Sequence, residues 1–505
     1  MKRWLLGALL GCALVGLGAC GGAAAPESIS LSSSTAALSA TRAPASTDEP
    51  ASTPALAALT AVPATPPTAP APTAPAPTAP AEAVTVVFWT SDNEPKRVAV
   101  YRSLAAQYEA THPGVKVNIV PFVESTALQQ LEAAQATGQM PDLIRVGIEW
   151  VSAFDGAGLL DPAAAQAVVD RVGPSDFREG VLAMVTDAAS GQLLAVPYDG
   201  WIQALWRRRD LFEQLGLNMP ITWADLNQAC DAIKAGGAPA FALALPTAGA
   251  QNYVHQVFEQ VAMSNNAWPF DASGNVTLST PEMVEALRFY TALQRCSPPA
   301  PQDLYSAREH FERGESAMLF YSTYIMDDLL EGSESADGGK VEIAVENLAG
   351  RTGFTSSLAG PNGVASYGQL VTLALLDGAA PEAQDVARFF LQEGYLDILA
   401  TAPLGKVPVL ESALDAWSAS SAVFQAYSPA TLGHIANGYA TMKRWVLRPG
   451  YTRAQKATIG AMEARLIIPA AIAQIVAGNL TPEAAAQQLQ RQVEELYRIQ
   501  TEGRD

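Results

Sequence analysis

The sequence predicts an α/β protein whose folded part has two lobes joined by a crossing strand, and three observations lead to this prediction. From Ala83 onward, apolar runs typical of buried strands alternate with segments whose apolar residues repeat at helical spacing. The chain has 505 residues, more than one hydrophobic core normally organises. The third observation is one long stretch, residues 195–211, with the pattern of a strand that leaves one body for another.

That stretch, AVPYDGWIQALWRRRDL, opens with apolar residues, is interrupted by a proline, an aspartate and a glycine, and resumes as an extended run up to Trp206. Tyr198 and Trp201 stand where the chain would cross. Because clefts between lobes are preferred ligand sites, we expect both side chains to line such a cleft. The arginines at positions 207–209 are expected to face solvent or to start a helix.

Three predicted strands begin the folded part. They are AVTVVFW from Ala83, VKVNIVPF from Val115 and DLIRVGI from Asp142, and a helix follows each of the first two. This order with short connections predicts a parallel sheet, in which ligands meet the loops at the carboxyl ends of the strands. The residues expected in those loops are Trp89, Thr90, Ser91, Asp92, Phe122, Glu124, Glu149 and Trp150.

A second body is expected from about Arg207. The segment TWAD at residues 222–225 is a predicted capping box for a helix, and PAFALALP at residues 239–246 is typical of a buried strand. The apolar run SAMLF gives a further strand, whose end presents Tyr321 and Tyr324. Both tyrosines are therefore candidates for the ligand site.

The first 83 residues are predicted to lie outside the folded part. Residues 1–20 combine basic residues, a short apolar stretch and small residues before Cys20, which is the pattern of a secretory signal. The tetrad LGAC resembles a bacterial lipobox, which implies that Cys20 carries lipid and anchors the protein to a membrane surface; the alternative is a chance cysteine after an ordinary signal. Residues 21–83 are almost wholly Ala, Pro, Thr and Ser, a composition typical of a disordered, extended linker.

Composition and motifs argue against several function classes. The chain carries 31 basic and 50 acidic residues, a net charge of −19, and no basic run interleaved with aromatic residues, so nucleic-acid binding is not expected. No GxSxG, HExxH or CxxC motif and no glycine-rich phosphate loop is present, and the four histidines are scattered, so we expect no enzyme, no metal and no other cofactor. With Cys20 assigned to lipid, Cys230 and Cys296 fit a disulfide or two buried thiols equally well.

Four motifs follow one another in order between Phe88 and Tyr324: FWTSDNEP, QMPDLIRVGIEWVSAFDGAGLLDP, LWRRRDLFEQLGLNMPITWADL and FERGESAMLFYSTY. Their order resembles that of extracellular solute-binding proteins of the maltose-binding type, family 1, and the likeness continues to the end of the chain. The resemblance implies a type II periplasmic-binding-protein-like fold with discontinuous lobes, residues 84–203 and 362–404 in lobe 1 and residues 204–361 and 405–505 in lobe 2. It also implies an extracytoplasmic binding component of an ABC importer, with two membrane permease subunits and an ATPase as partners. We expect a monomer.

The aromatic residues indicate what such a protein would bind. Nine tryptophans are present, several at predicted strand ends or loops. Aromatic faces suit the C–H faces of pyranose rings, and carboxylates and amides bond to the surrounding hydroxyls, so we expect a mono- or oligosaccharide captured by closure of a hinge. Tyr367 and Gln369 are included because the family's returning strand brings the segment VASYGQL to the cleft. The expected ligand-binding residues are Trp89, Asp92, Glu149, Trp150, Tyr198, Trp201, Trp268, Tyr321, Tyr324, Tyr367 and Gln369.

Two alternatives of other classes stay open. Asp92, Glu124 and Glu149 are carboxylates in predicted loops, and two of them could flank a glycosidic bond in an extracellular polysaccharide-acting enzyme. A surface sensor or adhesin that reuses the two-lobe fold would bind and close without a permease. We favour transport, because a hinge and a transporter-type leader explain more of the chain than an acid pair does.

Overall fold

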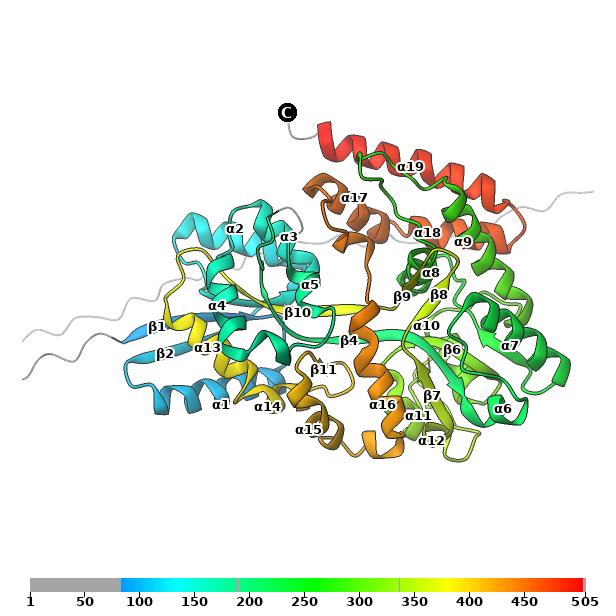
Figure 1. Ribbon diagram of the computed structural model, residues 1–505, viewed down its shortest axis with the longest axis horizontal. Helices are drawn as coiled ribbons and strands as arrows, with labels where there is room; N and C mark the ends of the chain where they lie inside the picture. The colour runs from blue at the N-terminus through cyan, green and yellow to red at the C-terminus, as the bar shows by residue number, and fades with distance from the viewer. Residues whose placement is uncertain (1–82, 188–189, 336, 503–505) are drawn as a thin grey trace, which may run out of the picture. The chain divides into compact units, whose positions relative to one another are not determined.

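The computed structural model describes residues 83–187, 190–335 and 337–502 (Figure 1). The chain divides into two units, residues 1–77 and 78–505, and the described residues belong to the second. The predicted signal, Cys20 and the predicted linker up to residue 82 lie outside the described residues.

One mixed sheet runs through the described unit in the strand order β2-β1-β3-β10-β4-β6-β5. Its first three strands along the chain are mutually parallel and lie where the sequence predicts them: β1 Val84–Thr90, β2 Val115–Pro121 and β3 Leu143–Gly147. Thr90 of β1 is level with Pro121 of β2 and with Arg145 of β3, so the carboxyl ends of the three strands meet at one edge. Helices cover this sheet, and the predicted α/β class is confirmed.

The strand β4, Val196–Arg208, links the two ends of the sheet (Figure 1). Its residues 196–203 pair antiparallel with β10, and residues 203–207 pair antiparallel with β6. The predicted crossing stretch is therefore the strand that is hydrogen-bonded to strands at both ends of the sheet. The remaining strands of this sheet are β5 Phe241–Ala244, β6 Ser316–Ser322, β7 Thr352–Thr355, β10 Tyr367–Leu375 and β11 Val407–Pro408, of which β7 and β11 pair with β4.

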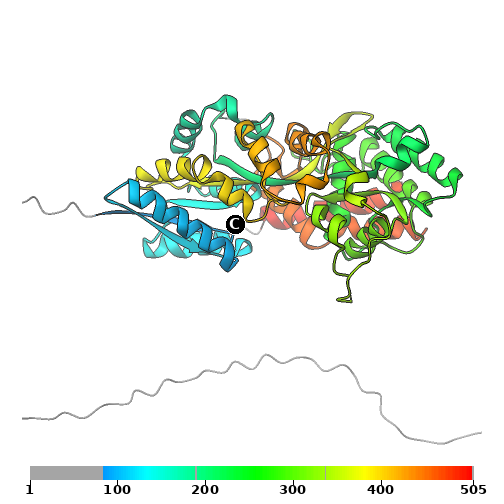
Figure 2. The ribbon, with the colours of Figure 1, turned by 90° about the horizontal axis from the view of Figure 1, so that it is seen from below.

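Helices cover the β2-β1-β3 end of the sheet. On one face, Phe88 of β1 contacts Tyr101 and Phe390 edge-on, with ring centroids 5.7 Å and 5.2 Å apart, so α1 and α13 lie on the same side of the strand (Figure 2). Helix α1 begins at Pro95, where a proline has no hydrogen bond to lose. The helices here are α1 Pro95–Thr111, α2 Ala127–Thr137, α3 Ile148–Gly156, α4 Pro162–Val172, α5 Val181–Val185, α13 Glu382–Leu391 and α14 Tyr395–Ala400.

The β6-β5 end carries its own helices. The predicted capping box is present at the start of α7, where the Thr222 side chain accepts from the Asp225 N–H and the Asp225 side chain accepts from the Thr222 N–H. Cys230 on α7 and Cys296 form a disulfide, which decides the choice that the sequence left open. The elements here are α6 Arg209–Gln214, α7 Trp223–Gly236, α8 Asn252–Ser264, α9 Pro281–Ala292, α10 Leu304–Glu312, α11 Ile325–Glu331, α12 Leu348–Arg351, and the two-stranded sheet of β8 Leu358–Gly360 and β9 Gly363–Ala365.

The expectation about the arginines that end the crossing stretch is confirmed for Arg209 and wrong for Arg208. Arg209 begins α6, whereas Arg208 is the last residue of β4 and is buried, with 6 % of its surface exposed. Its guanidinium is held by Asp210, with 2.7 Å between Nη2 and Oδ2. A carboxylate two residues along the chain thus supplies the partner that lets the charge be buried.

The chain continues into helices that lie on both sides of β4 in Figure 1, with α15 and α16 on one side and α17 to α19 on the other. The long helix α19 packs against α9, α17 and α18. Among the described residues no single helix is long and apolar enough to cross a membrane, and α17 with α18, bent by 50°, meets that test of length and composition only as a pair. The helices are α15 Leu414–Ala419, α16 Pro429–Ala436, α17 Arg453–Ala464, α18 Ile467–Val476 and α19 Pro482–Glu502.

Candidate ligand-binding site

Adjacent elements bring three of the predicted site residues together. Glu149 lies in the first turn of α3, which follows directly on the carboxyl end of β3. Gln369 of β10 and Trp201 of β4 face each other as cross-strand partners. Because β10 lies between β3 and β4, the three side chains meet where these strands and α3 come together.

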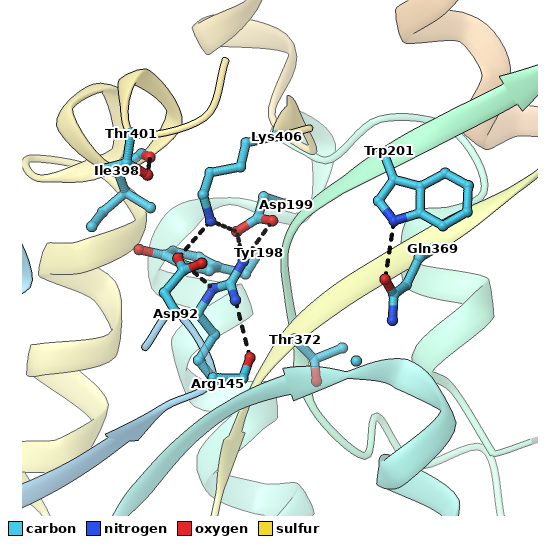
Figure 3. Close-up of polar contacts among 12 residues, drawn as sticks. Asp92, Arg145, Tyr198, Asp199, Trp201, Gln369, Thr372, Ile398, Thr401 and Lys406 are labelled. Atoms are coloured by element: carbon cyan, nitrogen blue, oxygen red, sulfur yellow. Dashed lines mark hydrogen bonds and ion pairs between the residues drawn. The ribbon is translucent and has the colours of Figure 1, made fainter. Parts of the chain in front are cut away.

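A short hydrogen-bonded chain connects these residues. The Trp201 indole Nε1–H donates to Gln369 Oε1 at 3.0 Å, as Figure 3 shows. Gln369 Nε2 donates in turn to Glu149 Oε1 at 2.7 Å. An indole can only donate and a carboxylate only accept, so the amide of Gln369 has a single orientation that satisfies both neighbours. The glutamine therefore fixes the position of the Glu149 carboxylate.

The second carboxylate oxygen of Glu149 is the unusual atom of the site. Glu149 Oε2 is buried and has no hydrogen-bond partner among the described residues. Burial raises the pKa of Glu149 above its usual range, although the nearby Arg444 opposes the shift. An unpartnered buried oxygen is costly, so a donor such as a ligand hydroxyl would be stabilised there.

Gly147, immediately before α3, leaves the room that this arrangement needs. A Cβ at this position would lie 2.6 Å from Gln369 Nε2 and from both Glu149 carboxylate oxygens. The Gly147 N–H also donates to Glu124 Oε1 at 2.5 Å. Glycine thus allows the glutamine and the glutamate to approach the backbone, and Glu124 holds that backbone in place.

Arg444 contributes a positive charge beside Tyr367, the fourth predicted residue in this region. Its guanidinium carbon lies 4.4 Å from the centre of the Tyr367 ring, and the guanidinium pairs with Glu259 at 3.3 Å and with Glu463 at 3.2 Å. Burial opposes the charge, but Tyr367 and the two glutamates raise the pKa of Arg444 beyond its usual value. The sequence did not point to Arg444, because it lies in no regular element and its partners are far away along the chain.

The same glutamates belong to the group of described residues that could hold a metal ion. Ligand atoms of His255, Glu259 and Glu463 lie within 4.8 Å of one another. His255 Nε2 is 3.0 Å from Glu259 Oε2, however, and Arg444 already pairs with both carboxylates. The Arg444 guanidinium already supplies the positive charge that a metal ion would bring to these carboxylates. The three residues therefore suit an ion-pair network better than a metal site.

Asp92 lies in a second, separate cluster of charged side chains. Its Oδ2 accepts from Lys406 Nζ at 2.6 Å, as Figure 3 shows. The same oxygen accepts from the Tyr101 hydroxyl at 3.0 Å. Arg145 donates to both oxygens of Asp199 at 2.9 Å and lies 3.6 Å from Asp92. These two carboxylates and two cations are each at most 5 % exposed. We define Asp92, Arg145, Asp199 and Lys406 as the charge cluster.

The charge cluster changes how Asp92 is interpreted. Burial raises the pKa of Asp92, but Arg145 and Lys406 lower it by more, so the carboxyl pKa lies far below its usual range. We expected this carboxylate in a loop facing a ligand; instead both of its oxygens are bonded within the protein. Lys406 comes from the segment next to β11 and Arg145 from β3, and this distance along the chain hid the cluster from sequence reasoning.

The remaining predicted residues lie in different surroundings. Trp89 belongs to β1 rather than to the loop after it, and its ring packs against Phe122 with centroids 5.9 Å apart. Trp150 is half-buried next to Glu149 on α3. Trp268 is half-buried, with the Arg448 guanidinium 4.8 Å from its ring. Among the tyrosines, the side chains of Tyr198, Tyr321 and Tyr367 are buried and that of Tyr324 is exposed.

Two cavities lie where α3 approaches α17. One of about 340 Å³ is lined by both helices, with Glu149 and Trp150 on one side and Ala457 and Gly460 on the other. A second of about 240 Å³ is lined by Ile148 of α3, by α5 and by the segment before α17. Lys456 and Ser152 line both cavities, and Lys456 Nζ donates to Ser152 Oγ at 2.6 Å.

Comparison with known proteins then decides the family. The sequence model of the family "Bacterial extracellular solute-binding protein" matches residues 91–396, more than half of the chain. The protein belongs to this family. The family match confirms the resemblance that the sequence motifs suggested.

Curated proteins with similar sequences include named binding proteins. The putative ABC transporter periplasmic-binding protein YcjN of Escherichia coli (strain K12) is 29 % identical over 308 residues, which cover 61 % of this chain and 68 % of YcjN. The mannitol-binding protein of Pseudomonas aeruginosa is 26 % identical over 299 residues, 57 % of this chain and 64 % of that protein. The alignments thus leave about a third of each relative unmatched.

Solved structures of sugar-binding proteins share the fold. The sugar-binding protein MalE from Xanthomonas citri superposes with a TM-score of 0.62 at 21 % identity, covering 84 % of this chain and all of MalE. The cyclic alpha-maltosyl-1,6-maltose binding protein from Arthrobacter globiformis gives 0.60 at 17 % identity, covering 82 % and 99 %. The family's fold is therefore that of the type II periplasmic binding proteins, as predicted.

Proposed function

We propose that this protein is the substrate-binding component of an ABC importer and that it captures a carbohydrate. The observation that carries the proposal is the buried, unpartnered Glu149 Oε2, held by Gln369 beside the Trp201 and Trp150 side chains. An acceptor beside aromatic surfaces suits a sugar, whose hydroxyls donate and whose C–H faces stack. The names of relatives support this choice, since they include mannitol-, lactose- and maltose-binding proteins.

Capture occurs by closure of a hinge between two lobes, residues 84–203 with 362–404 and residues 204–361 with 405–505. The continuity of β4 and the pairing of β10 and β11 with it support this division, because these strands form the short links between the ends of the sheet. In the open form the ligand contacts one lobe, and closure completes the contacts and excludes water. A membrane permease then distinguishes the loaded from the empty protein.

The proposal extends to where the protein works. Lipid on Cys20 anchors it outside the cytoplasm, and the linker that follows lets it reach two permease subunits and their ATPase. The lipobox-like tetrad before Cys20 and the Pro/Thr/Ala composition of residues 21–83 support this arrangement. The folded part acts as a monomer.

Thermal unfolding against a ligand panel tests the proposal. Mono- and oligosaccharides, polyols, amino acids and phosphate esters are each added to the folded chain, and the bound compound is recovered and identified. A ligand that binds the native state stabilises it by about 2.7 kcal/mol at a hundredfold excess over its dissociation constant. A shift with a sugar that is recovered intact supports import. Recovery of cleaved sugar would point to an enzyme, and a shift only with amino acids or phosphate esters would contradict the choice of carbohydrate.

A further inference from the structure

A group of basic side chains lies apart from the candidate ligand-binding site, where β4 leads into α6. Arg207 of β4 and Arg209 of α6 both extend over Gly353 of β7. A Cβ on this glycine would lie 2.6 Å from Arg207 Nη1 and 2.8 Å from Arg209 Cγ. Because Gly353 has no side chain, the two arginines can lie next to each other above the same residue. Neither of them lines the cavities beside α3.

Arg207 holds its charge without a hydrogen-bond partner. It is half-buried, and among the residues that the structure describes its guanidinium forms no hydrogen bond and no ion pair. The Phe212 ring, with its centre 5.9 Å from the guanidinium carbon, supplies no carbonyl or carboxylate oxygen. Burial and the neighbouring Arg209 lower the pKa of Arg207 to about 10, although Glu213 opposes the shift. An anion next to Arg207 would therefore be stabilised.

Arg209 and His434 supply further donors beside Arg207. Arg209 Nη2 donates to the Gly350 carbonyl oxygen at 3.3 Å, but its buried Nε has no partner within the described part of the chain. His434 lies on α16, which packs against β7, as α6 also does. Burial and the charge of Arg207 lower the pKa of His434, so its ring is within electrostatic reach of the guanidinium. We call Arg207, Arg209 and His434 the basic cluster.

The acidic side chains of the same segment leave the basic cluster without a neutralising partner. Asp210 Oδ2 lies 2.7 Å from Arg208 Nη2 and 3.4 Å from Arg351 Nη1, so this carboxylate already pairs with two other arginines. Glu213 is exposed and forms no ion pair with any described cation. The chain carries a net charge of −19, so an excess of basic residues does not account for this half-buried, unpaired positive charge.

The donors of the basic cluster suit a phosphate group. Arginine presents a planar set of N–H groups that matches the oxygens of carboxylates and phosphates. A carboxylate has only a pair of oxygens, whereas a phosphate group has more oxygens and carries a charge of about −1.5 to −2 at pH 7. Donors from three side chains, on β4, α6 and α16, match the larger anion better.

We infer that the basic cluster binds a phosphate group outside the candidate ligand-binding site. Arg207 supplies the main ion pair, and Arg209 Nε and the His434 ring supply further hydrogen bonds. The group belongs either to a soluble phosphate compound or to the headgroup of a membrane phospholipid, which share this chemistry. The inference does not depend on a sugar being the cargo.

Titration calorimetry with inorganic phosphate tests this inference. Ionic strength is held constant with sodium chloride, so that the general screening of charge stays the same. We expect wild type to bind phosphate at least tenfold more tightly than acetate, and Arg207→Gln to lower phosphate affinity at least tenfold. In NMR spectra the His434 ring signals should shift as phosphate binds, and those of His310, which lies on α10, should not.

Arg102→Gln is the matched control. Arg102 lies on α1, is exposed, and likewise has no hydrogen-bond or ion-pair partner in the chain as the structure describes it. We expect this variant to bind phosphate as wild type does. Arg207→Gln removes a half-buried charge that has no partner, so it should be no less stable than wild type. Should circular dichroism show that it folds poorly, Arg209→Gln repeats the test.

Two model compounds distinguish the sources of the phosphate group. Methyl phosphate is a monoester, like many soluble phosphate compounds, and dimethyl phosphate is a diester, like the common phospholipid headgroups. Binding of the diester as tightly as phosphate assigns the basic cluster to lipid, and binding of phosphate and the monoester alone assigns it to a soluble compound. Either result supports the inference when Arg207→Gln weakens that binding.

Two outcomes would overturn the inference. One is a phosphate affinity no greater than the acetate affinity, and the other is equal phosphate affinity in wild type and in a folded Arg207→Gln. Sugar affinity should be unchanged in Arg207→Gln, so the failure of this inference and the failure of sugar import can be told apart.

Discussion

At the scale of single residues, the charge cluster shows how burial and pairing decide what a carboxylate does. Asp92 and Glu149 both follow strands at the same edge of the sheet. Asp92 has Lys406, Arg145 and Tyr101 as partners, whereas Glu149 keeps one oxygen without any. We therefore propose that Asp92 contributes to the stability of the fold and that Glu149 contributes to ligand binding.

We predict that Asp92→Asn lowers the free energy of unfolding by about 3 kcal/mol, because it leaves buried cations without a compensating charge. Urea unfolding at pH 7 measures the change. Asp231→Asn is the control, since Asp231 is 71 % exposed and its pair with Arg295 is expected to contribute less than about 1 kcal/mol. Equal effects of the two substitutions would show that the charge cluster is not a stabilising unit.

The lowered pKa of Asp92 also predicts an acid dependence. The stability that comes from a carboxyl with a depressed folded-state pKa is present above its unfolded pKa of about 3.9 and is lost as pH falls toward the folded value. The difference in unfolding free energy between wild type and Asp92→Asn should therefore shrink as pH falls below about 4. A difference that stays constant from pH 7 to pH 2.5 would contradict this.

Glu149→Gln is predicted to have opposite effects on binding and stability. Burial raises the pKa of Glu149, so its charged form costs stability at pH 7, and the neutral variant should have a higher free energy of unfolding. Its sugar affinity should fall roughly 10–100-fold, because a hydrogen bond to a charged group is lost. Calorimetry and urea unfolding measure the two quantities, with the exposed Glu342→Gln as control. A variant that is both less stable and unimpaired in binding would reverse the assignment.

At the scale of elements, the disulfide is the contact with the clearest expected effect. It joins α7 to the 3-10 turn Leu293–Cys296 across a separation of 66 residues. By loop-closure entropy, a link of this span stabilises by about 4 kcal/mol. We expect the double variant Cys230→Ser with Cys296→Ser to be less stable by that order and insensitive to dithiothreitol, while oxidised wild type loses stability on reduction. Wild type that unfolds identically with and without reductant would contradict this.

The helices and strands also show how much of the fold the sequence alone predicts. Periodicity and caps predicted β1 to β3, β4 and α7, because each is a local pattern of apolar and polar residues. Local patterns could not predict which charges would be buried together. Arg145 of β3 and Lys406 beside β11 are separated by more than 250 residues, and only the order of the strands brings them to Asp92.

The candidate site was predictable to the same limited extent. Glu149 was named because it follows a predicted strand, and Trp201 because the crossing stretch was expected to line a cleft. Gln369 was named because the family resemblance implies that its strand returns to that cleft. Arg444 was not named, because a charge in an irregular segment leaves no pattern. Its importance depends on what lies opposite it after folding.

At the scale of the whole molecule, closure of the proposed hinge is the property to test. Lys456 and Ser152 join α17 to α3, which belong to different proposed lobes, so the described conformation already holds the two sides in contact. We expect small-angle scattering of the ligand-free protein to give a larger radius of gyration than this conformation has, and saturating sugar to reduce it. A radius that is unchanged at saturation would exclude hinge closure. Glu149→Gln serves as the control. Because we expect it to bind sugar more weakly, it should need a higher sugar concentration for the same decrease in the radius of gyration.

The position of β10 has a consequence for how the protein is made. This strand spans residues 367–375, yet it lies between β3 at 143–147 and β4 at 196–208. During synthesis the neighbouring edges of β3 and β4 therefore remain unpaired until more than 220 residues after β3 have been added. A chain whose central gap is filled so late stays incompletely folded during its synthesis, which would suit the export that the proposed extracytoplasmic function requires.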